Sequence, residues 1–470
     1  MLSQEQIEKM VGDILKELSE TEGAGACVPK ANSNGLYDDM NECIDAAIKV
    51  QKQFVAQGME KRREIVEAIR AAAIANVEKL AEAAFKETKY GSKEHKTAKC
   101  LLAAKKTPGV EDLELRSFTG DDGLTIIFPA PFGVVGSITP STNPIATVVN
   151  NAISMVSGGN TVVFSPHPAA KNCTAMAIEI LNAAAIAAGA PGPLLFAAKE
   201  PTIEKSQTLM NHPAIRILSI TGGEAIVKVA MKTGKKVIAA GPGNPPVIVD
   251  ETADIKKAAK NIVDGASFEN CIPCIAEKET FVVKSVGDEL LKEMVYAGAQ
   301  LIDSKQAEAL LATVLENKDG KYSPNRAYVG RDAAYLLESA GIPVIGKPRV
   351  VVTVTDKDHP FVTTEMLMPV MPVVYVNDVN EAIECAVEAE HGNHHSAHMH
   401  STNVDNLTKA ANALDTTIFV KNGPSYAGIG FGGEGFTTFT IATPTGEGLT
   451  SARSFTRIRR CTMRGSLKLM

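Results

Sequence analysis

The feature that most constrains the fold is the regular alternation of short apolar runs and helical segments after Gly123. Alternation at this interval predicts a parallel sheet wrapped by helices, because neighbouring parallel strands must be joined by a crossover connection. The apolar runs that we expect to form strands are 134–139, 161–165, 194–197, 215–221 and 236–239.

A second αβ section starts near Pro245, with further strands expected at 246–250, 280–284, 349–354, 373–376 and 416–420. Ahead of the first section, residues 40–104 are rich in Ala, Glu, Lys and Ile at helical spacing, which predicts a layer of two or three long helices. The fold class is therefore α/β, and we expect two αβ domains with a crevice between them.

The first 35 residues are expected to lie outside this body. Over 1–18, Ile7, Val11, Ile14 and Leu18 recur at intervals of three and four and predict a short amphipathic helix. Residues 19–35 are rich in Gly and small polar residues, which predicts a flexible linker. A helix of this length is marginal in water, so its apolar stripe needs a partner surface, either on its own domain or on another protein.

Composition excludes several classes of partner. The chain of 470 residues has a formal net charge of -6 and no long run of Lys and Arg, which argues against a nucleic-acid surface. We interpret the basic stretch at 453–464 as a charged edge strand or helix face.

Eight cysteines without paired spacing indicate free thiols in a reducing compartment. Charged residues interrupt the apolar ones at the start of the chain, so we expect no membrane span, no secretory leader and a cytoplasmic protein.

The segment 267–279 holds Cys271 and Cys274 between an expected helix and an expected strand, where a loop can present a thiol to a crevice. A cysteine reacts as its thiolate, so such a site must lower the usual thiol pKa of about 8.5 or supply a base. Taken alone, the pair also fits a redox dithiol, half of a zinc site or inert buried thiols. The chain has no second cysteine pair at zinc spacing and no thioredoxin-like context.

This segment resembles the nucleophile loop of the aldehyde dehydrogenase superfamily, and its ending at 274–279 looks like the CoA-acylating branch. The resemblance covers nearly the whole chain from about Gly35. It implies that Cys274 is the nucleophile and Cys271 a neighbour. It also implies an aldehyde-dehydrogenase-like fold, with a Rossmann-type NAD-binding domain over 36–244, a catalytic domain over 245–425, and a return of 426–470 to the cofactor domain.

A second block, 136–145, runs from an expected strand through a loop into an expected helix and contains Asn143. In the family, the Asn of this block donates a hydrogen bond to the oxygen of the tetrahedral intermediate, together with a backbone N–H at the nucleophile. Such donors are worth about 3 to 4 kcal/mol each in mutational tests. Without the family, Asn followed by Pro at a helix start is first a capping signal.

A third block, 220–224, follows a strand and opens a helix, so its N–H groups and the positive helix end suit a phosphate or a dinucleotide. A plain tight turn is the alternative. Family relatives commonly carry a Lys at the position of Ser165 that holds the adenosine ribose, so this chain departs there and NADP is not excluded beside NAD. The cofactor-binding residues implied by the resemblance are Thr139, Pro140, Ser141, Ser165, Pro166, His167, Thr221, Gly222, Gly223, Gly241, Glu365 and Leu367, with Glu365 at the nicotinamide ribose.

The most informative departure is at Ala239, where hydrolytic aldehyde dehydrogenases carry the Glu that activates water. Alanine accepts no proton, so water attack loses the roughly 10²- to 10⁴-fold that general-base catalysis contributes. A thioester that water removes slowly can wait for the thiol of coenzyme A, so we expect acyl transfer to CoA. A hydrolytic dehydrogenase and a catalytically silent shell adaptor are the alternatives.

Five of the nine histidines lie in 391–400, which invites a metal interpretation. His391 and His395 could share a helix face, yet Gly392 and Asn393 disfavour a helix, and we expect no metal. The acylating branch has a similar run, which implies that His395 helps CoA attack or orients the site.

The glycine-rich stretch at 422–435 and the block at 442–450 resemble the end of the acetaldehyde and propionaldehyde dehydrogenases of bacterial microcompartments. The resemblance implies a short-chain aldehyde substrate, the cofactor NAD with CoA as co-substrate, and a location in the microcompartment lumen. It further implies docking to a shell protein through 1–18. An arm at 112–130 and a strand after Ser451 are expected to join copies into a dimer or tetramer.

Overall fold

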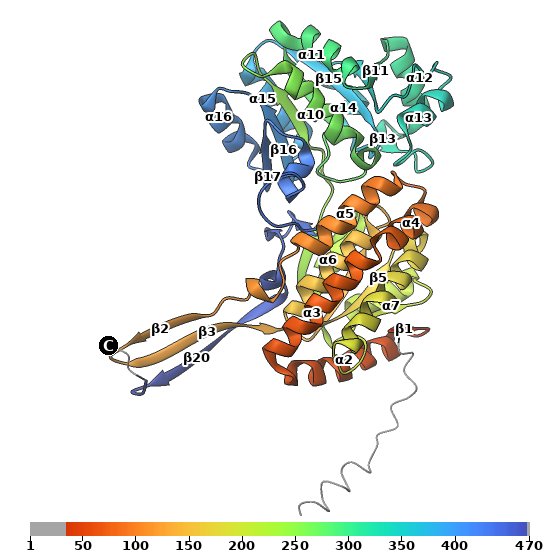
Figure 1. Ribbon diagram of the computed structural model, residues 1–470. Helices are drawn as coiled ribbons and strands as arrows, with labels where there is room; N and C mark the ends of the chain where they lie inside the picture. Colours follow the sequence, from red (N-terminus) through yellow and green to blue (C-terminus); the bar gives the residue numbers. More distant parts are fainter. Residues whose placement is uncertain (1–33, 468–470) are drawn as a thin grey trace, which may run out of the picture.

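The computed structural model describes residues 34–467. The expected helix at 1–18 and nearly all of the expected linker at 19–35 lie outside these residues. Two lobes, each built on a parallel sheet, lie one above the other, and a long narrow arm projects from the lower lobe (Figure 1). The α/β fold class expected from the sequence is confirmed.

The lower lobe is a six-stranded parallel sheet with the strand order β1-β6-β5-β4-β7-β8. Its strands form where the sequence has short apolar runs, and two of them, β4 and β7, match the expected bounds. Chain order reverses at β4, which has β5 on one side and β7 on the other, so the ends of these strands form a topological switch point. The strand bounds are β1 Leu36–Tyr37, β4 Val134–Thr139, β5 Thr161–Pro166, β6 Leu195–Ala198, β7 Ile215–Thr221 and β8 Lys236–Ala240.

Helices cover both faces of this sheet, and consecutive strand residues pack against opposite layers. Val162 and Phe164 join the cluster with α3, α6 and α7, whereas Val163 joins the cluster with α2, α8 and α9. This alternation is the two-residue period of a strand buried on both faces. The helices are α2 Met40–Ala56, α3 Gly58–Ala75, α4 Val77–Thr88, α5 Lys93–Lys106, α6 Pro144–Ser157, α7 Lys171–Ala187, α8 Ile203–Asn211 and α9 Glu224–Met231.

The expectation of two or three helices over 40–104 was wrong, because four helices, α2 to α5, occupy this region and its end. α2 is followed by Gly58, which has a φ of 84°, and α3 is followed at once by Asn76, whose Nδ2 donates to the carbonyl of Ala72. α4 ends at Lys89 in the left-handed conformation. These breaks fall inside a continuous apolar periodicity, so the pattern alone does not reveal them.

The upper lobe is a seven-stranded parallel sheet with the order β11-β14-β15-β10-β9-β16-β17. One face packs on α10 and α11 and the other on α15 and α16. The strands are β9 Pro246–Val249, β10 Glu279–Val283, β11 Ala299–Leu301, β14 Val350–Val354, β15 Val370–Val376, β16 Ser396–His400 and β17 Ile418–Lys421. The helices are α10 Ile255–Ser267, α11 Lys284–Tyr296, α12 Ser304–Val314, α13 Ala333–Ser339, α14 Pro360–Thr363, α15 Val379–Glu390 and α16 Val404–Leu414.

Four strands of this lobe are absent from the sequence-based expectation. β11 is short, the hairpin of β12 Leu315–Lys318 and β13 Lys321–Pro324 is polar, and β16 carries three of the clustered histidines on or beside a central strand. Histidine and serine are unusual in a buried strand, so composition argued against β16. Further short elements are η1 Val110–Asp112, η2 Pro168–Ala170, η3 Phe268–Cys271, η4 Ser425–Ile429, η5 Ala452–Phe455, β18 Ile441–Ala442 and β19 Gly448–Leu449.

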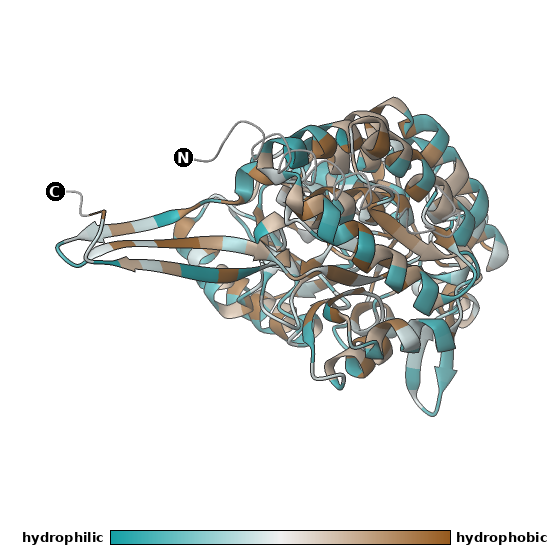
Figure 2. Ribbon diagram, turned by 90° about the horizontal axis from the view of Figure 1, so that it is seen from below, coloured by the Kyte–Doolittle hydropathy of each residue, from teal (hydrophilic) through white to brown (hydrophobic). Residues whose placement is uncertain are grey.

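The arm is an antiparallel three-stranded sheet of β2 Arg116–Gly120, β3 Gly123–Pro131 and β20 Thr456–Arg464. It extends far beyond the body, and both apolar and polar residues colour its strands (Figure 2). Phe118 is 57% and Ile458 is 66% exposed. The basic stretch at 453–464 thus forms largely an edge strand, one of the two alternatives expected for it.

Candidate active site

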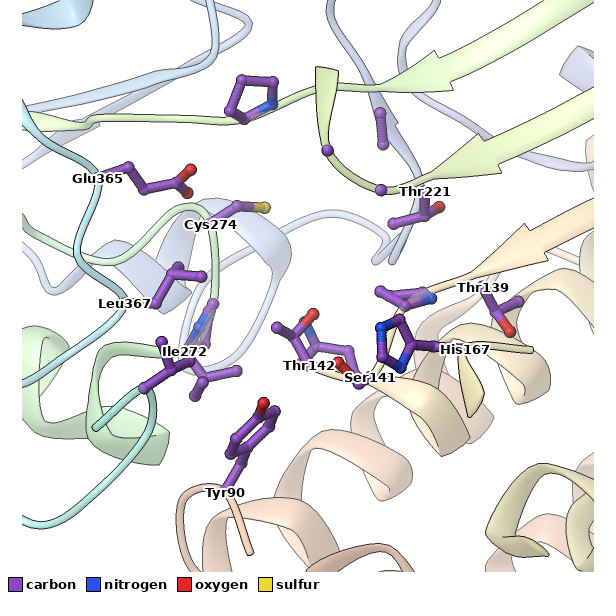
Figure 3. A pocket seen from close by; sticks show the side chains of 18 of the residues that line it. Tyr90, Thr139, Ser141, Thr142, His167, Thr221, Ile272, Cys274, Glu365 and Leu367 are labelled. Carbon is purple, nitrogen blue, oxygen red and sulfur yellow. The ribbon is translucent and has the colours of Figure 1, made fainter. Parts of the chain in front are cut away.

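A cavity of about 930 Å³ lies between the lobes, where the carboxyl ends of the lower strands face the amino ends of the upper ones. Thr139 and Thr221 end β4 and β7 at the switch point, the position where open α/β sheets bind ligands. The loop before β10 supplies Cys274, and the segment before β15 supplies Glu365 and Leu367. Cys274 and Glu365 come from one side of the cavity and Thr139, His167 and Thr221 from the other (Figure 3).

Fourteen of the fifteen site residues named in the sequence analysis, most of them implied by the family resemblance, line this cavity. These are Cys274, Asn143, Thr139, Pro140, Ser141, Ser165, Pro166, His167, Thr221, Gly222, Gly223, Gly241, Glu365 and Leu367. His395 is the exception: its side chain is fully buried and does not line the cavity.

Cys274 and Cys271 occupy different environments. Cys274 is half-buried on the cavity wall, whereas Cys271 is 1% exposed and does not line the cavity. The buried Lys278 ammonium donates to the carbonyl of Cys271 at 2.9 Å and contacts its Sγ at 3.3 Å. Both cysteines are free thiols. Only Cys274 is therefore placed to meet a ligand in the cavity.

The protein environment disfavours the Cys274 thiolate. Burial and the nearby Glu365 carboxyl raise the pKa of Cys274 to about 12, and Lys278 opposes this shift. Burial also raises the pKa of Glu365 itself. A reactive cysteine needs either a lowered thiol pKa or a nearby base. The pKa of Cys274 is instead raised. Cys274 is thus held as a neutral thiol at neutral pH.

Close approach of the backbone fixes the nucleophile loop. A Cβ at Gly243 would lie 2.8 Å from the carbonyl oxygen of Cys274 and 2.9 Å from Cγ of His395, so no side chain fits there. Glu269, Asn270 and Cys271 all have φ between 54° and 64°. Such conformations are strained for residues other than glycine, and surrounding contacts must maintain them.

A buried charge network supports this strained turn. The Glu269 carboxylate pairs with Lys96 Nζ at 3.0 Å and with Lys99 Nζ at 2.9 Å, and all three side chains are at most 3% exposed. The backbone N–H of Glu269 donates to Nδ1 of His95 at 2.9 Å. Burial alone would raise the pKa of Glu269, but Lys99 and Lys96 hold it below its usual value.

Asn143 does not act as a capping residue, although it precedes α6. Its side chain makes no hydrogen bond to the start of the helix. Instead its Oδ1 accepts a hydrogen bond of 2.5 Å from Lys99 Nζ. The structure therefore decides against the helix cap, and the Asn143 amide stays available to the cavity that it lines.

The residues of the lower lobe fit a dinucleotide. The hydroxyls of Thr139 and Thr221 are buried and make no hydrogen bond within the described residues, and both residues line the cavity. Gly222 and Gly223 precede α9, where free N–H groups and the helix dipole favour a phosphate. Ser165 Oγ lies 2.8 Å from Ser206 Oγ, so two small hydroxyls lie side by side at the position where the family resemblance led us to expect a Lys.

His395 is a neutral imidazole behind the cavity wall. Its Nδ1 lies 2.8 Å from Ser396 Oγ, its backbone N–H donates to Glu390 Oε1, and burial and Lys278 lower its pKa to about 4. Moving a proton to it from a thiol of pKa about 8.5 costs roughly 6 kcal/mol. This favours an orienting role over that of a base for CoA. Residues 34–467 contain no group of three or more potential metal ligands.

Several cavity residues were missed by the sequence argument, notably Tyr90, Lys99 and Arg326. For Lys99 a signal existed. Lys96, Lys99, Cys100 and Ala103 recur at helical spacing, and all are buried on one stripe of α5. Two lysines on an otherwise apolar stripe indicate buried ion pairs. Tyr90 and Arg326 follow an ordinary turn and a polar hairpin, which carry no such signal.

Two stacked α/β lobes, with a cysteine loop facing a dinucleotide-type switch point, define the class of cysteine-dependent nucleotide-cofactor enzymes. The family model described as "Aldehyde dehydrogenase family" matches residues 26–440. The chain belongs to the aldehyde dehydrogenase family.

Its relatives at high identity are acylating enzymes. The chain is 48% identical over 472 residues to the acetylating acetaldehyde dehydrogenase of Salmonella typhimurium (strain LT2), covering 100% of both. It is 45% identical to the CoA-propanoylating propanal dehydrogenase of Citrobacter freundii, covering 97% of this chain and 98% of the relative.

The solved structures agree with this grouping. Rhodopseudomonas palustris propionaldehyde dehydrogenase with bound CoA and an acylated cysteine is 46% identical, with a TM-score of 0.91, over 93% of this chain and 100% of that one. The propionaldehyde dehydrogenase of the Clostridium phytofermentans fucose utilisation bacterial microcompartment is 46% identical, with the same TM-score and the same coverage of both chains. No helix among the described residues is long and apolar enough to cross a membrane.

Proposed function

We propose that this chain is a CoA-acylating aldehyde dehydrogenase that converts a short-chain aldehyde, CoA and NAD⁺ into an acyl-CoA and NADH. The observation that carries the proposal is the cavity that places Cys274 opposite the dinucleotide-type residues Thr139 and Thr221. Relatives that acylate CoA from acetaldehyde or propanal, at 45 to 48% identity, support the substrate class.

In the proposed mechanism, Cys274 first loses its proton to solvent and then adds to the aldehyde carbonyl as the thiolate, and the Asn143 amide stabilises the oxygen as it becomes negative. NAD, when bound, accepts the hydride. Thr139, Ser141, Gly222 and Gly223 would hold the dinucleotide, and Glu365 would bind its nicotinamide ribose. The thioester on Cys274 then transfers its acyl group to the thiol of CoA.

Ala239 supports transfer to CoA over hydrolysis. It lies in β8 with its side chain fully buried, and its backbone N–H donates to Thr445 Oγ1 at 3.1 Å. The methyl side chain of Ala239 cannot accept a proton from water. The acidic residues on the cavity wall are Glu316 and Glu365, and burial raises the pKa of Glu365.

A single assay tests the proposal. NADH formation from propionaldehyde or acetaldehyde is followed by absorbance with and without CoA. We expect sustained turnover only with CoA. Equal turnover without CoA would identify a hydrolytic dehydrogenase, and no aldehyde-dependent signal under either condition would leave the adaptor as the better account. A panel from acetaldehyde to butyraldehyde then defines the preferred chain length.

We also propose two interactions. The arm of β2, β3 and β20 exposes Phe118 and Ile458 on strands that leave the body, which suits pairing with a second copy into a dimer or tetramer. Light scattering of the Phe118→Asp, Ile458→Asp double variant should then report a smaller particle than the unchanged chain.

The second proposed interaction is docking of residues 1–18 on a microcompartment shell protein, which would put the enzyme in the lumen. Fusion of these residues to a fluorescent protein should carry it into purified compartments.

A further inference from the structure

The ammonium group of Lys99 lies between the nucleophile loop and Asn143. It contacts Glu269 Oε2 at 2.9 Å and Asn143 Oδ1 at 2.5 Å. Glu269 begins the left-handed turn that leads to Cys274, and Asn143 begins α6 of the lower lobe. One buried cation therefore connects the two residues on which the proposed chemistry depends.

The contact fixes which way the Asn143 amide faces. An ammonium group carries only donors, so the atom that it contacts must be the amide oxygen and not the nitrogen. The Nδ2 group, which carries the two hydrogens, must then point away from Lys99. Asn143 lines the cavity, and within the described residues its Nδ2 has no hydrogen-bond partner. A rotated amide would present an acceptor to the developing oxyanion and repel it.

The charges of the network explain why Lys99 makes this contact. Lys96, Lys99 and Glu269 together carry one surplus positive charge in a fully buried setting. A buried cation needs acceptors beyond its partner carboxylate. The Asn143 carbonyl oxygen is such an acceptor for Lys99, whereas Lys96 pairs with the other carboxylate oxygen of Glu269.

We propose that Lys99 is a positioning residue: it holds the Asn143 amide with its N–H groups toward the cavity and ties that amide to the nucleophile loop through Glu269. This inference rests on the proposed function of Asn143 as the oxyanion donor. It assigns a role in the reaction to a side chain for which the sequence argument gave none.

Lys96 supplies a matched control. Lys96→Met and Lys99→Met each remove one equally buried lysine and leave Glu269 with one partner, so the remaining pair is electrically balanced and both variants should fold. Only Lys99→Met also releases Asn143. We expect Lys99→Met to lower kcat for propionaldehyde with CoA about 10-fold or more, below the about 10²- to 10³-fold loss typical when an oxyanion donor is removed. The KM values for NAD⁺ and CoA should stay near those of Lys96→Met.

A double-mutant cycle separates positioning from other roles. In the Asn143→Ala background, Lys99→Met should cost little further activity, because a residue that acts through Asn143 has nothing left to position. Additive losses would overturn the proposal and indicate direct contact with substrate. Equal losses for Lys96→Met and Lys99→Met would also overturn it and leave a structural role. If Lys99→Met does not fold, judged by thermal unfolding, Lys99→Gln takes its place in the same cycle.

The outcomes for this inference and for the proposed function can be told apart. If the unchanged protein forms no NADH from propionaldehyde and CoA, the proposed function fails before any variant is compared. If the unchanged protein is active and the cycle is additive, the function stands and the positioning role fails.

Discussion

The state of the Cys274 thiol in the ligand-free protein can be tested by alkylation. Burial and Glu365 place its pKa at about 12, so at pH 7.5 only about one thiol in 30,000 is ionised. An ordinary thiol of pKa about 8.5 is about one-tenth ionised. A more basic thiolate is a stronger nucleophile. The high pKa of Cys274 therefore offsets about half, on a logarithmic scale, of the rate lost through its smaller ionised fraction. Iodoacetamide should therefore react with Cys274 roughly 50- to 100-fold more slowly than with a small free thiol.

The dependence on pH is the sharper test. Far below its pKa, the thiolate fraction rises tenfold per pH unit, so the alkylation rate should increase about 100-fold between pH 7 and pH 9. Glu365→Gln removes a carboxylate that raises the pKa and should speed alkylation. The exposed Cys461 would also react, so the assay uses a Cys461→Ser background and locates the label by peptide mapping. A rate that levels off between pH 7 and pH 9 would refute the burial argument.

Three further predictions concern the site. Cys274→Ala should abolish NADH formation, while cofactor binding, measured by fluorescence titration, persists. Cys271→Ala changes a buried thiol that does not line the cavity and should retain turnover. The reverse result would reassign the nucleophile. In Asn143→Asp, the new carboxylate should pair with Lys99, but the N–H donor of the amide is lost. We expect kcat to fall about 10²- to 10³-fold with an unchanged melting temperature. A kcat close to that of the unchanged protein would exclude Asn143 from oxyanion binding. Ala239→Glu buries an unpaired carboxylate in the sheet and should lower the unfolding free energy by about 3 kcal/mol or more, measured by denaturant titration, whereas an unchanged unfolding free energy would contradict the burial of this side chain.

The sequence predicted the parallel sheets because their strands, such as β4 and β7, are continuous apolar runs bounded by polar turns. It failed at β16, where Ser396, His398 and His400 are buried in a central strand. Their burial depends on tertiary contacts, such as His398 Nε2 at 3.0 Å from the carbonyl oxygen of Ile275. No local pattern encodes a contact between residues so far apart in the chain.

The candidate site divides in the same way. Residues at strand ends, such as Thr139 and Thr221, follow from topology, because the carboxyl ends of adjacent parallel strands meet at one edge. The Cys274 loop came from family resemblance. The pKa of its thiol could not be inferred, because that value depends on burial and on Glu365, which comes from a distant later part of the chain. His395 shows what a motif leaves open: its place in the run did not reveal that its side chain is fully buried and does not line the cavity.

The most direct test of the central claim is mass spectrometry of the protein after reaction with propionaldehyde and NAD⁺ in the absence of CoA. The account predicts a propionyl adduct on the peptide that contains Cys274, and its loss within seconds to minutes when CoA is added. An adduct on another residue, or no adduct despite NADH formation, would contradict it.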